Sequence, residues 1–107
     1  MNELTLTDAD AGRKVSVRVG DVIMLHLPEN AAAGYQWRTS HDDPAHVEVR
    51  RERYDTVNAS TGSAGIAVWK LTAKLPGSAR IELKKSRPWE NTDTGAQTFA
   101  ITLDVTG

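Results

Sequence analysis

The chain has 107 residues, no cysteine, and 13 basic against 14 acidic residues, which gives a formal net charge of -1 at pH 7. This length suits a single domain, spanning residues 1–107, that buries its own core. The absence of cysteine excludes disulfides, thiolate metal sites and a cysteine nucleophile, and the balanced charge argues against nonspecific binding to nucleic acid or to an anionic membrane.

Apolar residues recur with a period of two along most of the chain, which predicts β-strands and no long helix. In chain order, the first strand carries Val15, Val17 and Val19 on one face. The denser apolar run over residues 22–27 predicts a central strand that is covered on both faces. We expect Pro28 to end this strand, because proline cannot donate a ladder hydrogen bond.

The next strand is predicted over residues 35–40, where Tyr35 and Trp37 alternate with polar residues. A strand over residues 47–54 follows and ends at Tyr54; its second half carries the charged residues Arg50, Arg51, Glu52 and Arg53. Charges of this kind protect an edge strand from pairing with another chain. We expect these side chains, like Lys84 and Lys85 further on, to be solvated.

Three more strands complete the pattern. The first, over residues 66–75, places apolar residues on one face: Trp69, Leu71, Ala73 and Leu75. The turn at Pro76 and Gly77 predicts a hairpin into a strand over residues 79–85. The last strand, over residues 97–105, has the inward-facing set Phe99, Ile101, Leu103 and Val105. We expect Trp37 and Trp69 to lie in the core.

These strands, with turn signals about every ten residues, predict an all-β fold, namely an immunoglobulin-like β-sandwich of about seven to eight strands. If successive strands alternate in direction, the connections that contain residues 30–35, 62–65 and 87–89 lie at one pole of the sandwich. The turns at Pro44 and Pro76 then lie at the other pole. Loops on a rigid scaffold often carry function, so the first pole is the candidate functional surface.

The three connections contain residue types suited to binding a partner. Gly34 can adopt positive φ at no steric cost, which lets the chain turn sharply into the next strand. The backbone between Gly62 and Gly65 is open to a partner that pairs with it like a strand. In the third connection, Pro88 fixes the backbone between an arginine and a tryptophan, the residue types most enriched at interface hot spots.

In order and spacing, these segments resemble the loops of the chagasin family of cysteine-peptidase inhibitors, which carry Asn-Pro-Thr-Thr-Gly-Tyr/Phe, Gly-x-Gly-Gly and Arg-Pro-Trp/Phe motifs. The resemblance covers almost the whole chain. It implies an immunoglobulin-like fold and a papain-like cysteine peptidase as partner, whose active-site cleft is blocked reversibly. It also implies the peptidase-binding residues Asn30, Ala31, Ala32, Ala33, Gly34, Tyr35, Gly62, Ser63, Ala64, Gly65, Arg87, Pro88 and Trp89.

The chain departs from these motifs at two places. Ala31, Ala32 and Ala33 replace Pro-Thr-Thr, which removes one restraint on φ and two hydroxyl groups. Each lost hydrogen bond weakens binding by about 0.5 to 1.5 kcal/mol, so we expect a weaker or differently selective inhibitor. Ala64 replaces a glycine of the second motif, which matters only if that position needs positive φ.

The residues themselves leave other interpretations open. Tyr35 can close the sandwich rather than touch a partner, Asn30 can cap its own loop, and Trp89 can fold back over the end of the sandwich. An adhesion or carbohydrate-binding module of the same fold can use these loops for another ligand. An enzyme is not expected, because the three histidines lack metal-ligand spacing and Ser63 lacks the Gly-x-Ser-x-Gly elbow. His41, Asp42 and Asp43 are predicted at the pole opposite Ser63, so we expect no catalytic residue, metal or cofactor.

The N-terminal residues lack a basic segment followed by an apolar stretch, and no apolar run approaches the roughly 20 residues of a membrane span. We therefore expect a cytoplasmic protein that does not contact membranes, or a periplasmic or secreted one if the chain is a processed form. The charged strand over residues 47–54 favours a monomer when the chain is free.

Overall fold

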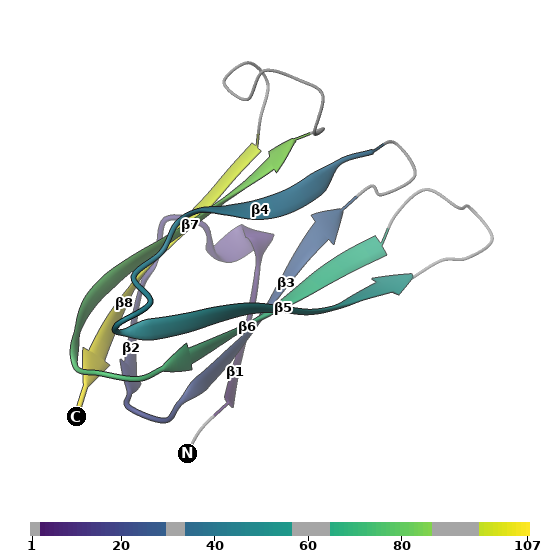
Figure 1. Cartoon of the computed structure of the whole chain (residues 1–107). Helices are drawn as coiled ribbons and strands as arrows, with labels where there is room; N and C mark the ends of the chain where they lie inside the picture. The colour runs from purple at the N-terminus through teal and green to yellow at the C-terminus, as the bar shows by residue number, and fades with distance from the viewer. Residues whose placement is uncertain (1–2, 30–33, 57–64, 87–96) are drawn as a thin grey trace.

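The computed structural model describes residues 3–29, 34–56, 65–86 and 97–107, which form a sandwich of two four-stranded sheets (Figure 1). One sheet has the strand order β1-β3-β6-β5 and the other has the order β2-β8-β7-β4. The strands are β1 (Glu3–Thr7), β2 (Lys14–Arg18), β3 (Val22–Glu29), β4 (Gln36–His41), β5 (Val47–Thr56), β6 (Gly65–Ala73), β7 (Gly77–Ser86) and β8 (Gln97–Thr106). The predicted immunoglobulin-like β-sandwich is confirmed.

The core lies between the two sheets and is made by alternate residues of each strand. In β3 the inward residues are Ile23, Leu25 and Leu27, and in β8 they include Phe99 and Ile101, all of which are buried. The predicted core positions of the two tryptophans are also confirmed, since Trp37 is 4% exposed and Trp69 is 6% exposed. The outward residues of β3 are partly exposed, so this central strand is fully covered on its inner face only.

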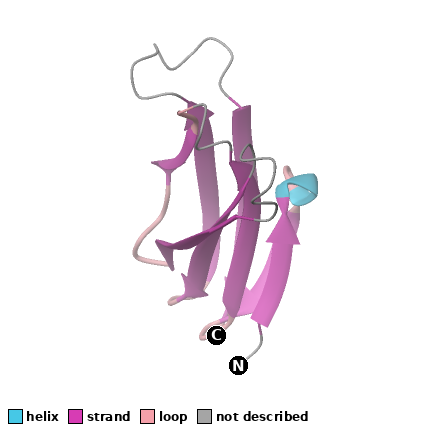
Figure 2. Ribbon diagram, turned by 90° about the vertical axis from the view of Figure 1, so that its right-hand side faces the viewer, coloured by secondary structure: helices cyan, strands magenta, loops and turns pink. Residues whose placement is uncertain are grey.

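The N-terminal strand β1 was not predicted, because its alternation of apolar and polar residues is too short to stand out. It pairs in parallel with β3 and leads into a short 3-10 helix, η1 (Asp8–Asp10) (Figure 2). Thr7 caps this turn by accepting a hydrogen bond from the Ala9 N–H, while Asp10 accepts one from the Thr7 N–H at 2.9 Å. Arg13 donates a further hydrogen bond to Asp10 at 2.6 Å.

The hydrogen bonds of Asp10 predict how the stability of the fold changes in acid. The Thr7 N–H, and then Arg13, hold the pKa of Asp10 below its ordinary value of 3.8. A lowered pKa in the folded state stabilises the protein at pH values above 3.8, and this contribution is lost as the pH falls through the folded-state pKa. We therefore expect Asp10→Asn to lower the urea midpoint at neutral pH, with the difference from wild type closing below pH 3.8. A difference that stays constant in urea titrations across this range would contradict the prediction.

Pro28 does not end β3, contrary to the prediction. The strand continues through Pro28 to Glu29, and both residues pair with the beginning of β6. The neighbouring strand β1 has already ended at Thr7, which lies opposite His26. Pro28 therefore occupies a position where β3 has a strand on one side only, and such edge positions tolerate proline.

The predicted hairpin at Pro76 and Gly77 is also wrong. β6 and β7 belong to different sheets, so this connection crosses from one layer to the other. Two residues assigned to inward faces are exposed: Val19, at 43%, follows the end of β2, and Leu75, at 53%, follows the end of β6. In each case the chain has begun to turn toward the other sheet, at Gly20 with φ 94° and at Gly77 with φ 142°.

The prediction that residues 47–54 form an edge strand is confirmed, since β5 ends its sheet and extends two residues further, to Thr56. Its ladder is interrupted by a bulge between Arg51 and Arg53, and β4, at the edge of the other sheet, has a bulge between Thr39 and His41. Bulges of this kind hinder edge-to-edge pairing with another chain. Within the described ranges, no helix is long and apolar enough to cross a membrane.

Candidate functional site

The strand ends that flank the three candidate segments lie together at one end of the sandwich (Figure 1). In one sheet, Glu29 at the end of β3 pairs with Gly65 at the start of β6, which also pairs with Thr56 at the end of β5. In the other sheet, Gln36 at the start of β4 pairs with Ser86, and Lys85 pairs with Gln97 at the start of β8. We call this end the loop pole. Residues 30–33, 57–64 and 87–96 connect strand ends that all belong to it.

Three of the predicted site residues are described by the structure, namely Gly34, Tyr35 and Gly65. The other ten lie outside the described residues: Asn30, Ala31, Ala32, Ala33, Gly62, Ser63, Ala64, Arg87, Pro88 and Trp89. Gly34 has φ 86°, as expected for a residue that turns the chain into β4. The Tyr35 side chain is half-buried, and the Lys85 ammonium lies 6.0 Å from the centre of its ring.

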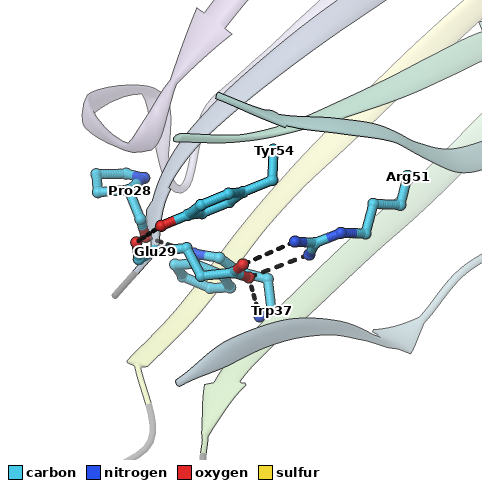
Figure 3. A network of polar contacts seen from close by, with 5 residues as sticks. All are labelled: Pro28, Glu29, Trp37, Arg51 and Tyr54. Atoms are coloured by element: carbon cyan, nitrogen blue, oxygen red, sulfur yellow. Dashed lines mark hydrogen bonds and ion pairs between the residues drawn. The ribbon is translucent and has the colours of Figure 1, made fainter. Parts of the chain in front are cut away.

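A buried carboxylate lies at the base of the loop pole (Figure 3). Glu29 is 3% exposed, and its Oε2 accepts a hydrogen bond of 2.7 Å from the Trp37 backbone N–H. The Arg51 guanidinium donates to both carboxylate oxygens, at 3.1 Å to Oε2 and 2.7 Å to Oε1. Hydrogen bonding to Glu29 raises the pKa of Arg51 above its ordinary value, so the guanidinium keeps its charge throughout the physiological range.

Two further hydrogen bonds surround this carboxylate. The Trp37 indole N–H donates to the Pro28 carbonyl oxygen at 2.7 Å, and the Tyr54 hydroxyl donates to the Glu29 carbonyl oxygen at 3.1 Å. We call the five residues drawn in Figure 3 the Glu29 network: Pro28, Glu29, Trp37, Arg51 and Tyr54. The network joins the last residues of β3 to β4 of the opposite sheet and to β5 of the same sheet.

The bulge in β5 explains how Arg51 and Tyr54 both reach this network. Arg51 pairs with Trp69, and Tyr54 pairs with Ala67, both inward-facing positions of β6. Two residues that are three apart in a regular strand point to opposite faces, but the extra residue of the bulge brings them to the same face. The expectation that all the charged residues of this strand are solvated is therefore wrong for Arg51. Its guanidinium carbon also lies 5.9 Å from the centre of the Trp69 ring.

Gly65 has a packing role rather than an open backbone. It is buried, pairs with strands on both sides, and has no positive φ. A Cβ at this position would collide with the ring and hydroxyl of Tyr54, and it would lie 2.8 Å from the Asp55 carbonyl oxygen. Gly65 is therefore required by the Tyr54 ring, which crosses it to reach Glu29. The idea that its backbone is open to a pairing partner does not fit this position.

The surface next to the network is hollowed. An open depression of about 370 Å³ lies between the edge strands β4 and β5 and is lined by Glu29, Gly34, Tyr35, Gln36, Arg51 and Tyr54. A second depression, of about 310 Å³, lies on the other open side of the sandwich and includes Trp37 and Lys85 in its lining. The Lys85 ammonium lies 5.6 Å from the centre of the Trp37 ring. The prediction that Lys85 is a solvated charge is therefore wrong.

The residues considered for an enzyme lie elsewhere. β4 begins at the loop pole with Gln36 and ends with His41, so His41, Asp42 and Asp43 lie toward the opposite pole. There the His46 ring contacts the Asp43 carboxylate at 3.1 Å. Within the part of the chain that the structure describes, no group of three His, Cys, Asp or Glu residues is placed to hold a metal ion.

No motif of the sequence pointed to Glu29, Arg51 or Tyr54 as functional candidates. A signal for the first two was present, because Glu29 continues the inward series of Leu25 and Leu27, and Arg51 continues that of Val47 and Val49. An acidic and a basic residue that both fall on inward positions predict a buried ion pair. Tyr54 carried no such signal, since its inward direction depends on the bulge.

Comparison with known proteins identifies the family. A family model described as chagasin family peptidase inhibitor I42 matches residues 16–103. Chagasin from Trypanosoma cruzi is 22% identical over 103 residues, which cover 92% of this chain and 94% of that protein. The cysteine protease inhibitor EhICP2 from Entamoeba histolytica has a similar crystal structure, with a TM-score of 0.87, 20% identity and coverage of 99% of this chain and 97% of that chain.

A second similar structure is that of PbICP-C in complex with falcipain-2. It has a TM-score of 0.71 and 19% identity, and the match covers 99% of this chain and 91% of that chain. The two structural matches show a shared fold. The family model spans most of the chain and shows which family the chain belongs to. Members of this family are cysteine protease inhibitors and not enzymes. This chain belongs to the chagasin family of peptidase inhibitors.

Proposed function

We propose that this chain is a reversible inhibitor of papain-like cysteine peptidases and that the loop pole blocks the active-site cleft of the peptidase. The observation that carries the proposal is the common position of the strand ends that flank the three motif segments. The proposed contact residues are those of the motifs: Asn30, Ala31, Ala32, Ala33, Gly34, Tyr35, Gly62, Ser63, Ala64, Arg87, Pro88 and Trp89. Gly65 supports this surface from below through its packing against Tyr54.

Two properties of the described residues support a steric block rather than a chemical one. The chain has no cysteine, and two carboxylates described near the loop pole are already paired with arginines, Glu29 with Arg51 and Asp55 with Arg53. The Glu29 carboxylate is already occupied by three donors, so it is not available as a base. A rigid sandwich that presents loops from both sheets can fill a cleft without forming a covalent bond. The complex of the relative PbICP-C with falcipain-2 supports a peptidase as the partner.

The expected result is that the purified chain inhibits papain in a concentration-dependent and reversible way. The measurement is the steady-state hydrolysis rate of a fluorogenic peptide at increasing inhibitor concentration, with trypsin as a control that should be unaffected. Full papain activity at about 100 µM of the chain would overturn the proposal, since this excludes even weak binding. Papain whose active-site cysteine has been alkylated with a bulky reagent should bind the chain less well. Equal binding to blocked papain would instead indicate a module that recognises another surface.

A further inference from the structure

A buried charge at the base of the loop pole needs a physical reason. The Glu29 side chain is 2% exposed, and removing a carboxylate from water is unfavourable by several kcal/mol unless donors offset it. Here the donors come from two directions, since Trp37 belongs to β4 of the opposite sheet and Arg51 belongs to β5 of the same sheet. An apolar residue at position 29 would continue the inward series of β3 without this penalty. The ion pair therefore points to a requirement for a defined geometry at this place.

Glu29 fixes the geometry at the ends of the connection from β3 to β4, which crosses from one sheet to the other. Glu29 directly precedes residues 30–33, and Trp37 is the second residue of β4, so the bond of 2.7 Å between them joins the two ends of the connection. The indole bond from Trp37 to the Pro28 carbonyl oxygen, also 2.7 Å, joins the same two ends a second time. Because both bonds run between the sheets, they set how far apart and at which angle the chain leaves β3 and enters β4.

The sequence of the connection shows why its ends matter. Ala31, Ala32 and Ala33 carry no polar side-chain atom and no ring that restricts φ. Side chains of this type cannot hold a loop in one conformation by themselves. The described ends of the segment do carry such restraints, since Gly34 has φ 86° and the Glu29 network holds the flanking strands.

The same network reaches the second connection. Arg51, near the middle of β5, and Tyr54, near its end, both bind Glu29, and β5 is the strand that leads to residues 57–64. Tyr54 also crosses Gly65, the first residue after that segment. The ends of the first and second connections are therefore linked through one residue.

We propose that Glu29 and Arg51 are positioning residues of the peptidase-binding surface, which fix the relative placement of the first two connections before a peptidase binds. This inference rests on the proposed function, because it assigns the network a part in inhibition. The two residues act through the backbone of Trp37 and of residue 29 itself. A pre-organised surface binds more tightly, because the apparent dissociation constant rises in inverse proportion to the fraction of molecules in the binding-competent conformation.

Glu29→Gln is the most direct test, because glutamine has the same shape and no charge. In one orientation its NH2 group faces the Arg51 guanidinium, and in the other it faces the Trp37 N–H, so one donor always opposes another donor. If this leaves the surface competent about one tenth of the time, the inhibition constant for papain rises about tenfold. Arg51→Lys keeps the charge and loses the two-pronged contact, and we expect a smaller rise, of about threefold.

The matched control is Val47→Ala, at the opposite end of β5. Val47 is fully buried and pairs with Ala73, at the end of β6 away from the loop pole, so we expect its truncation to destabilise the fold mainly at that end. The inhibition constant of each variant is measured under conditions in which the variant remains folded. It is then compared with the urea midpoint of the same variant. In a combined Glu29→Gln and Arg51→Lys variant, the inhibition constant should rise by less than the product of the two single fold-increases. The reason is that both substitutions break the same contact.

The second readout is hydrogen exchange of the Trp37 amide, which does not depend on inhibition. We expect Glu29→Gln to accelerate this exchange selectively, because an amide oxygen accepts the Trp37 N–H bond more weakly than a carboxylate and an NH2 group does not accept it at all. Val47→Ala should change the exchange only in step with global stability. Inhibition that falls no further in Glu29→Gln than in Val47→Ala overturns the proposal, and so does an unchanged Trp37 exchange rate. If the wild type itself does not inhibit papain, the proposed function fails together with the role in inhibition. In that case the exchange rates still decide whether Glu29 holds the two ends of the connection.

Discussion

Replacing Trp89 with alanine is expected to raise the inhibition constant for papain by about 30-fold or more. A tryptophan that is buried at the centre of an interface commonly contributes about 2 kcal/mol or more, and about 1.4 kcal/mol corresponds to a factor of ten. The measurement is the inhibition constant of Trp89→Ala and of wild type under identical conditions, together with their urea midpoints. An unchanged midpoint assigns the whole effect to the interface.

The urea midpoint separates this role from the alternative one. If the Trp89 ring instead packs over the end of the sandwich, its removal lowers the midpoint and leaves inhibition nearly unchanged. Ala32→Thr provides the comparison within the first connection. It restores one hydroxyl, and a single hydrogen bond changes binding by about 0.5 to 1.5 kcal/mol, so its effect should be smaller than that of Trp89→Ala. A larger effect of Ala32→Thr would show that the first connection dominates binding.

Gly65→Ala is expected to lower the free energy of unfolding by about 2 to 3 kcal/mol. Forcing a methyl group into a packed site typically destabilises by about 1 to 3 kcal/mol, and displacing Tyr54 also removes its hydrogen bond to Glu29. Urea unfolding followed by tryptophan fluorescence measures the effect.

Removing the Tyr54 ring provides the control for this prediction. In a Tyr54→Ala background, the added methyl group at position 65 no longer meets the ring, so its further effect should be clearly smaller. Some effect should remain, because the Asp55 carbonyl oxygen would still lie 2.8 Å from the new carbon. If Gly65→Ala is equally destabilising in both backgrounds, the glycine is required for a reason other than the Tyr54 ring.

Much of the fold could be predicted from the sequence, because its signals are local. Alternate residues of a strand face the core, so apolar residues recur with a period of two. This period is present in Ile23, Leu25 and Leu27, and again in Phe99 and Ile101, all of which are buried. The errors arose where a local signal depends on a distant partner. Pro28 was expected to end its strand, yet its position is tolerated because β1 stops opposite His26. The turn at Gly77 favours a hairpin when it is considered by itself, but a turn does not determine which sheet the next strand joins.

The candidate surface was predictable as a set of segments and not as a set of contacts. Gly34 was correctly expected to have positive φ, because only glycine takes that conformation without steric strain. The Glu29 network was missed because it combines three strands, and its geometry depends on a bulge that shifts Tyr54 to the inner face. Such a bulge leaves no reliable trace in the sequence. The role of Gly65 was likewise hidden, since it follows from the ring that crosses it.

The three connections at the loop pole differ in how they join the layers. β5 and β6 are neighbours in one sheet, and β7 and β8 are neighbours in the other, whereas β3 and β4 belong to different sheets. The two hairpins therefore move with their own layers, and the distance between their ends is set by the thickness of the apolar filling between the sheets. Buried side chains near the loop pole, such as Phe99 and Leu27, thus set the width of the surface that we propose enters a peptidase cleft. Under the proposed function, a change in the volume of these interior residues would therefore alter peptidase preference while every proposed contact residue stays the same.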